Sequence, residues 1–147
     1  ERSEKTQVIA DFYQQWSSEA LVVDQWFMVQ ASSPQPDALD NVQALMQHEA
    51  FEMTNPNKIR ALIGAFCNNN PVNFHRLDGA GYAFLADQII ALNNINHKVA
   101  SRMSTILTRW ANYDRVRADL IKAQLTRIKA EKLSPDVYEI VSKALNQ

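Results

Sequence analysis

Apolar residues recur along most of the chain at steps of three and four positions, rather than alternating with polar ones. This spacing places them on one face of an α-helix, so the pattern predicts helices almost throughout and requires no strand. Proline, glycine and asparagine separate the stripes. The apolar stripes begin near Val8, Leu21, Leu39, Ile59, Tyr82, Val99, Leu120 and Val137. We therefore expect an all-α fold of about eight helices.

Two of these helices have distinct sequence signatures. The segment from Leu21 to about Ser32 is apolar nearly all round, which predicts a helix buried on every side. Asn55-Pro56 is typical of an N-cap followed by proline at the first helical position. The helix that it opens carries apolar residues at regular helical spacing up to Phe66.

The connections between the helices are short, which favours antiparallel neighbours. Helix starts near Lys58 and Lys98 lie forty residues apart, a weak sign of paired-helix repeats. We expect a superhelical, HEAT/armadillo-like antiparallel helix array with a concave side.

Composition supports one folded domain spanning residues 1–147. Hydrophobic residues make up 46% of the chain and charged residues 21%, as in soluble globular proteins. No run of about 18 apolar residues occurs, so we expect no membrane span. The chain begins at Glu1 without a signal peptide, which suggests a fragment of a larger protein. Cys67 is its only cysteine, which excludes an internal disulfide and favours a reducing, cytoplasmic setting.

Charge is distributed unevenly although the net charge is only −1. Residues 1–57 hold two basic and nine acidic side chains, whereas residues 58–147 hold thirteen basic and seven acidic ones. The second part therefore has a net charge of +6. This uneven distribution of charge predicts a face that contacts anionic ligand groups or another domain.

Catalytic motifs are incomplete in this sequence. The segment from His48 to Glu52 begins like the zinc-protease motif H-E-x-x-H, but its fifth residue is Glu52 instead of the second histidine ligand. His75 and His97 fall in predicted loops without a second ligand at helical spacing. No Ser-His-Asp order, phosphate-binding glycine loop or CxxC pair occurs. We therefore expect no catalytic residues and no metal within this chain.

Basic residues recur every seven positions at Arg115, Lys122 and Lys129, and such a stripe could contact phosphates. Acidic residues interleave with them and the isoelectric point is near 6.3. A solvated helix face explains the stripe better than nucleic-acid binding does.

Arg60 and Arg102 are the candidate ligand-binding residues, because each flanks the apolar stripe of a well-defined helix. A guanidinium at the border of a core either forms a structural ion pair or points into a concave site. Spacing alone leaves both roles open, the structural one being the more common for such arginines.

Several blocks of this sequence resemble the C-terminal domain of bacterial-type aminopeptidase N, in the gluzincin family of zinc aminopeptidases. The resemblance covers nearly the whole chain, and its most specific block is Asn55–Phe66. The other matching blocks are Trp26–Ala31, Pro36–Leu39, Asn70-Pro71, Phe74-His75, Asp78-Gly79, Gly81-Tyr82, Phe84–Gln88, Val99–Arg102 and Leu133–Leu145.

The resemblance implies that this chain is the non-catalytic C-terminal helical domain of a larger multidomain enzyme. The zinc-binding catalytic domain would lie upstream in the same chain and would hold the cofactor. The C-terminal domain would close over it and form a chamber that admits peptides. Arg60 and Arg102 match arginines that line this chamber in the family, whereas His97-Lys98 departs from the family's Pro-Gln.

An alternative is an independent helical-repeat scaffold that binds protein or nucleic acid through its concave face. The two hypotheses differ in what precedes Glu1. A zinc motif within a few hundred upstream residues would support the enzyme, whereas a nearby start codon would support the scaffold.

Overall fold

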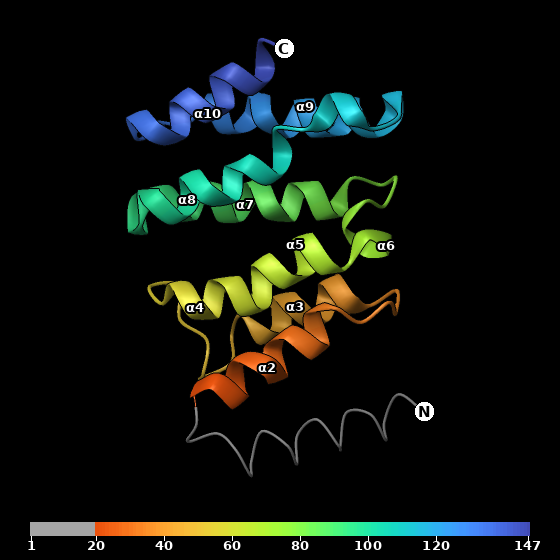
Figure 1. Ribbon diagram of the computed structural model, residues 1–147, viewed down its shortest axis with the longest axis vertical. Helices are drawn as coiled ribbons and strands as arrows, with labels where there is room; N and C mark the ends of the chain where they lie inside the picture. Colours follow the sequence, from red (N-terminus) through yellow and green to blue (C-terminus); the bar gives the residue numbers. More distant parts are fainter. Residues whose placement is uncertain (1–19) are drawn as a thin grey trace. The chain divides into compact units, whose positions relative to one another are not determined.

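The computed structural model describes residues 20–147, which consist of helices, turns and loops without a strand (Figure 1). The all-α prediction is therefore confirmed for this part of the chain. The predicted helix around Val8 lies outside the described residues. The described chain forms two compact units, residues 20–70 and residues 71–147, and each is treated by itself below. No described helix is long and apolar enough to cross a bilayer.

The first unit contains α2 (Ala20–Ala31), α3 (Ala38–Leu45) and a continuous helical stretch over residues 56–69. That stretch consists of α4 (Pro56–Ile59), a π-helical turn η1 (Arg60–Gly64) and α5 (Ala65–Asn69). Asn55 caps it as the sequence predicts, because its side-chain oxygen accepts a hydrogen bond from the Asn57 N–H at 3.0 Å.

The core of this unit forms where α2 packs against α3 and against the 56–69 stretch. Phe27, Leu62 and Phe66 are fully buried there. Asn70 closes the unit, because its side-chain amide donates hydrogen bonds to the carbonyls of Ala31 at 2.8 Å and Ser33 at 2.6 Å. These bonds satisfy backbone groups that the end of α2 leaves without helical partners.

The prediction that α2 is buried on every side is wrong. Leu21 is 79% exposed and Val29 is 66% exposed, while Trp26 and Phe27 on the other face are buried. Because α2 is apolar nearly all round, its sequence does not indicate which face is buried. In the structure, the other described helices of this unit cover only one face of α2.

The second unit contains two longer helices, α7 (Ala80–Ile95) and α9 (Arg115–Lys129), with α8 (His97–Ser104) and α10 (Pro135–Leu145) packed against them (Figure 1). The short α6 (Pro71–Phe74) precedes α7, and two 3₁₀ turns, η2 (Thr105–Leu107) and η3 (Trp110–Asn112), lead from α8 to α9. The buried side chains at its core include Tyr82, Leu85, Ile89, Leu107, Ile121, Leu125 and Val141.

The apolar stripe that begins near Val99 forms only a short helix in the structure, because α8 ends at Ser104. The Thr105 hydroxyl donates to the Arg102 carbonyl, and the Thr108 hydroxyl donates to the Thr105 carbonyl. Such local side-chain bonds compete with the helical backbone pattern. The chain consequently turns through η2 and η3, and Trp110 is anchored by its indole N–H to the Ala144 carbonyl at 2.8 Å.

Candidate functional site

Arg60 begins the π-helical turn η1, and its side chain is exposed. Its guanidinium donates a hydrogen bond to the side-chain oxygen of Asn57, one turn earlier. A Cβ added at Gly64 would lie 3.8 Å from the Arg60 Cγ, so the arginine stem runs alongside this glycine. Single π-helical turns are often found at functional sites. Arg60 thus lies at the surface, and the hydrogen-bond partner of its guanidinium is the neutral side chain of Asn57.

Lys58, two residues before Arg60, has the opposite environment. It is buried, and its ammonium lies 2.5 Å from the carboxylate of Asp24 on α2. Buried lysines are rare unless they are paired. Sequence reasoning missed this ion pair because its partners are 34 positions apart, although an acidic residue within the apolar α2 segment already required a partner.

Arg102 lies on α8, which Asn96 caps by accepting a hydrogen bond from the Val99 N–H at 3.3 Å. Its side chain is exposed, and Lys98 precedes it by one helical turn. Within the described residues, the guanidiniums of Arg60 and Arg102 form no ion pair with a carboxylate. The structural ion-pair alternative is thus not observed for either residue. Arg60 belongs to the first unit and Arg102 to the second, so the surroundings of each arginine are those of its own unit.

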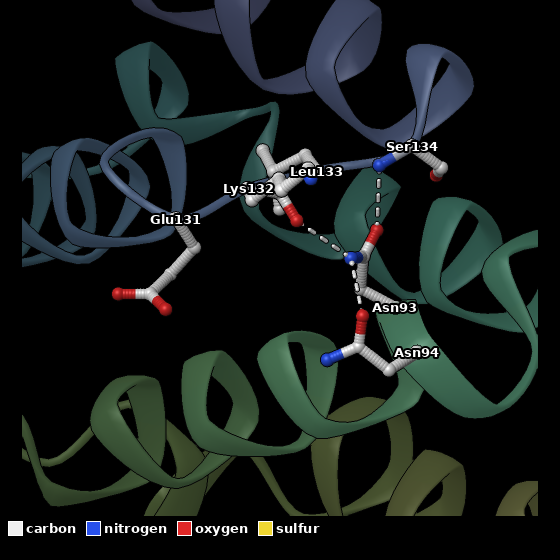
Figure 2. A pocket seen from close by; sticks show the side chains of 6 residues that line it. All are labelled: Asn93, Asn94, Glu131, Lys132, Leu133 and Ser134. Atoms are coloured by element: carbon white, nitrogen blue, oxygen red, sulfur yellow. Dashed lines mark hydrogen bonds between the residues drawn. The ribbon is translucent and has the colours of Figure 1, made fainter.

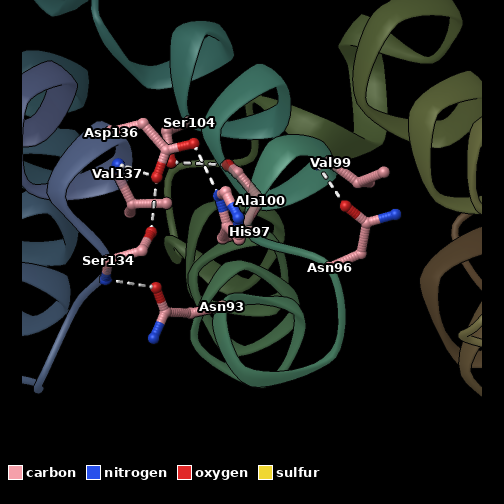
Figure 3. A network of polar contacts seen from close by, with 9 residues as sticks. All are labelled: Asn93, Asn96, His97, Val99, Ala100, Ser104, Ser134, Asp136 and Val137. Atoms are coloured by element: carbon pink, nitrogen blue, oxygen red, sulfur yellow. Dashed lines mark hydrogen bonds and ion pairs between the residues drawn. The ribbon is translucent and has the colours of Figure 1, made fainter.

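The His97-Lys98 segment, where the sequence departs from the expected family pattern, makes a defined contact through its histidine. The Nδ1 of His97 lies 2.9 Å from the carboxylate of Asp136 at the start of α10 (Figure 3). Asp136 also accepts hydrogen bonds from the Ser134 hydroxyl and the Val137 N–H. Asn93 of α7 extends this network by accepting the Ser134 N–H at 2.8 Å. The network joins the start of α8 to the start of α10.

This network lowers the pKa of Asp136 to about 2, first through the Ser134 hydroxyl and then through His97. We expect His97→Ala to raise that pKa, because one hydrogen bond to the charged carboxylate is lost. A carboxyl group with a lowered pKa in the folded state stabilises the fold above its ordinary pKa. That contribution is lost as the pH falls toward 2. Carboxyl NMR titration of both proteins measures the change, and an identical pKa would contradict the assignment.

A shallow pocket lies beside this network, where α7 meets the loop between α9 and α10 (Figure 2). It is lined by Asn93, Asn94, Glu131, Lys132, Leu133 and Ser134. The side-chain amide of Asn93 donates to the Lys132 carbonyl at 3.0 Å, while its oxygen accepts the Ser134 N–H. In Figure 2 the Glu131 carboxylate points away from the asparagines. The polar groups of the pocket hold the loop in place. They do not form a group of catalytic residues.

The zinc-motif-like segment has no metal-binding geometry. His48 accepts the Ala50 N–H through its Nδ1 at 3.0 Å, and its ring packs 5.2 Å from that of Trp26. Glu49 and Glu52 are exposed. Within the described residues, no three histidine, cysteine, aspartate or glutamate side chains lie close enough together to hold a metal ion.

His75 belongs to an aromatic cluster at the start of α7. Its Nδ1 lies 2.6 Å from the hydroxyl of Tyr82, and its ring packs 4.8 Å from that of Tyr113. Burial and the neighbouring Arg117 lower the pKa of His75, while burial raises the pKa of Tyr82 to about 12. Arg117 donates to the His75 carbonyl at 2.7 Å, which ties the start of α9 to this cluster. His75 is therefore part of a packed junction between helices.

The basic residues that recur along α9 contact neighbours within the same unit. The ammonium of Lys122 lies 4.8 Å from the ring centre of Trp110, and that of Lys129 lies 5.9 Å from Tyr138. Arg115 lies 3.9 Å from Asp119 on the same helix. This arrangement agrees with the interpretation of the stripe as a solvated helix face.

Comparisons with known proteins agree with the resemblance found in the sequence. Residues 1–146 match a family described as a domain of unknown function (DUF3458_C) with ARM repeats. The aminopeptidase N of Caulobacter vibrioides is 47% identical over 96% of this chain, and that of Escherichia coli is 44% identical over 94%. This chain spans only 16% of the length of either relative.

A solved structure gives the same answer for the fold. The crystal structure of Legionella pneumophila aminopeptidase A in complex with aspartic acid matches 98% of this chain with a TM-score of 0.94 and 35% identity. This chain covers 17% of that protein. The resemblance to bacterial aminopeptidases N is thus confirmed, and the chain belongs to the ARM-repeat domain family DUF3458_C.

Proposed function

We propose that this chain serves as the non-catalytic C-terminal domain of a zinc-dependent aminopeptidase. In that enzyme it closes the active-site chamber and controls the access of peptides whose N-terminal residues are removed. The observation that carries the proposal is the 42–47% identity to three aminopeptidases N along nearly the whole chain. The zinc and the catalytic residues would belong to a domain upstream in the same protein. The single, buried Cys67 supports a reducing, cytoplasmic setting.

In this proposal Arg60 and Arg102 face the chamber and bind carbonyl or carboxylate groups of the peptide. Both guanidiniums are exposed and have no carboxylate partner within the described residues, so their charge is available to a ligand. A planar guanidinium matches a carboxylate with two parallel hydrogen bonds.

The proposal is tested by locating zinc and activity in the protein. We expect the full-length enzyme to hydrolyse an alanyl substrate, to hold about one zinc per chain, and to lose activity with a chelator. Residues 1–147 alone should hold no stoichiometric zinc after dialysis and should not turn the substrate over. Elemental analysis and a chromogenic assay measure both proteins. Zinc and turnover in the isolated chain, or a full-length protein without peptidase activity, would contradict the proposal.

A further inference from the structure

The cations of residues 71–147 divide sharply into those with a partner and those without one. Five arginine or lysine side chains pair with carboxylates, and two lysines lie over aromatic rings. The paired residues are Arg76, Arg115, Arg117, Arg127 and Lys143, and the two lysines over rings are Lys122 and Lys129. Among these residues, Lys98, Arg102, Arg109 and Lys132 make no such side-chain contact. Three of these four lie on α8 or shortly after its end.

Two of these cations lie side by side on α8. Lys98 and Arg102 are both exposed and are separated by one helical turn, which places them on the same face about 6 Å apart along the axis. We call Lys98 and Arg102 the α8 cation pair. Helix α8 carries no acidic residue, and Asp136, which contacts its first residue, is engaged by His97 and Ser134. No carboxylate of the unit forms an ion pair with Lys98 or Arg102.

This arrangement runs against two rules of helix stability. Like charges one turn apart repel each other. A cation in the first turn, the position of Lys98, also interacts unfavourably with the positive end of the helix dipole. Five of the nine other cations of this unit pair with a carboxylate, whereas neither Lys98 nor Arg102 does. Such departures from local rules are expected at functional positions, and a bound anion would relieve both.

We propose that the α8 cation pair binds a carboxylate of the peptide substrate, downstream of the residue that is removed, and gives the enzyme a preference for acidic peptides. This inference rests on the proposed function, because it places a substrate beside α8. Lys98 is the specificity-determining member, since it adds a second positive charge beside Arg102. A compact ammonium and a planar guanidinium together can hold one carboxylate through charge-assisted hydrogen bonds. The carboxylate can come from an aspartate or glutamate side chain or from the peptide's C-terminus.

The test compares matched substrates in the full-length enzyme. The peptides are Ala-Ala-Glu-Ala and Ala-Ala-Gln-Ala, each with a free or an amidated C-terminus. The variants are Lys98→Gln and Lys98→Glu, with Lys132→Glu as the control because Lys132 is an unpartnered cation away from α8. One measured ratio is kcat/KM for the Glu peptide divided by kcat/KM for the Gln peptide with the same C-terminus. The other is kcat/KM for the free C-terminus divided by kcat/KM for the amidated C-terminus of the same sequence. Both ratios are measured at low and at high salt.

We expect Lys98→Gln to lower one of these ratios about two- to fivefold and Lys98→Glu to lower it about five- to twentyfold, as for exposed charge pairs. Salt should weaken the preference of the unaltered enzyme. Lys132→Glu should leave both ratios unchanged. A loss seen with the Glu peptides identifies the side chain as the source of the carboxylate, and a loss that depends on the free terminus identifies the C-terminus.

The inference is overturned if the Lys98 variants hydrolyse charged and neutral peptides in the original ratio, or if Lys132→Glu lowers the ratio equally. It is also overturned if an oligonucleotide competes with the acidic peptide as well as an oligoglutamate of equal charge, since the surface would then bind any polyanion. Each result requires an active enzyme. A full-length protein that hydrolyses none of the peptides would instead contradict the proposed function.

Discussion

Replacing Gly81 with alanine should destabilise the second unit by about 3 kcal/mol or more. The backbone of α6 lies directly against α7 at this residue. A Cβ at position 81 would be 2.8 Å from both the carbonyl carbon and the Cα of Phe74, and closer still to its carbonyl oxygen. These are backbone atoms, so rotation of a side chain cannot relieve the clash. Urea denaturation of residues 1–147, followed by circular dichroism, measures the loss.

Gly64→Ala is the matched control for this prediction. A Cβ at position 64 would meet only ordinary contacts, the nearest being the Arg60 Cγ at 3.8 Å. The helical backbone there suits alanine, which should stabilise the chain by about 0.5–1 kcal/mol. If both substitutions change the free energy of unfolding equally, the close approach of α6 to Gly81 is not what requires glycine.

Lys58→Ala should destabilise the first unit by about 3–5 kcal/mol. The substitution leaves the carboxylate of Asp24 without the ammonium that lies 2.5 Å from it, in a site where the two side chains are only 17% and 10% exposed. A charge that is shielded from water and has lost its partner is costly. The free energy of unfolding from urea denaturation, compared with that of the unaltered chain, measures the effect.

Two further variants separate the unpaired charge from the loss of the side chain. Lys143→Ala removes an ion pair with Glu139 whose side chains are 77% and 62% exposed, so it should change the stability little. The double variant Lys58→Met with Asp24→Leu removes both charges and fills the same space. It should recover most of the stability. A double variant as unstable as Lys58→Ala would show that the ion pair itself is not responsible.

Helices were predictable wherever local signals decide the outcome. The spacing of apolar residues located α7, α9 and α10, and Asn55-Pro56 marked the start of the 56–69 stretch. The π-helical turn at Arg60 and the early end of α8 were not predictable. Both depend on backbone hydrogen bonds and local threonine contacts that a periodic pattern does not contain. The exposed face of α2 was missed because burial of an apolar helix depends on its neighbours.

The candidate site was predictable only as a pair of residues. Sequence spacing selected Arg60 and Arg102 but left their role open between an ion pair and a ligand contact. Within the described residues neither guanidinium pairs with a carboxylate, and the ligand-binding role of the two arginines stays a prediction. The pairing of Lys58 with Asp24 and of His97 with Asp136 joins residues 34 and 39 positions apart. Contacts at that distance in sequence depend on how the helices pack.

The chamber role is tested most directly by comparing two classes of substrate in full-length enzyme carrying Arg60→Ala or Arg102→Ala. A charge-assisted hydrogen bond contributes about 1.5–3 kcal/mol, so each change should lower kcat/KM for oligopeptides about tenfold to a hundredfold. Chromogenic substrates with a single amino acid should be hardly affected if, as proposed, the arginines contact peptide residues beyond the cleavage site. Equal losses for both substrate classes, or variants that fail to fold, would show that the arginines are structural and would contradict the account.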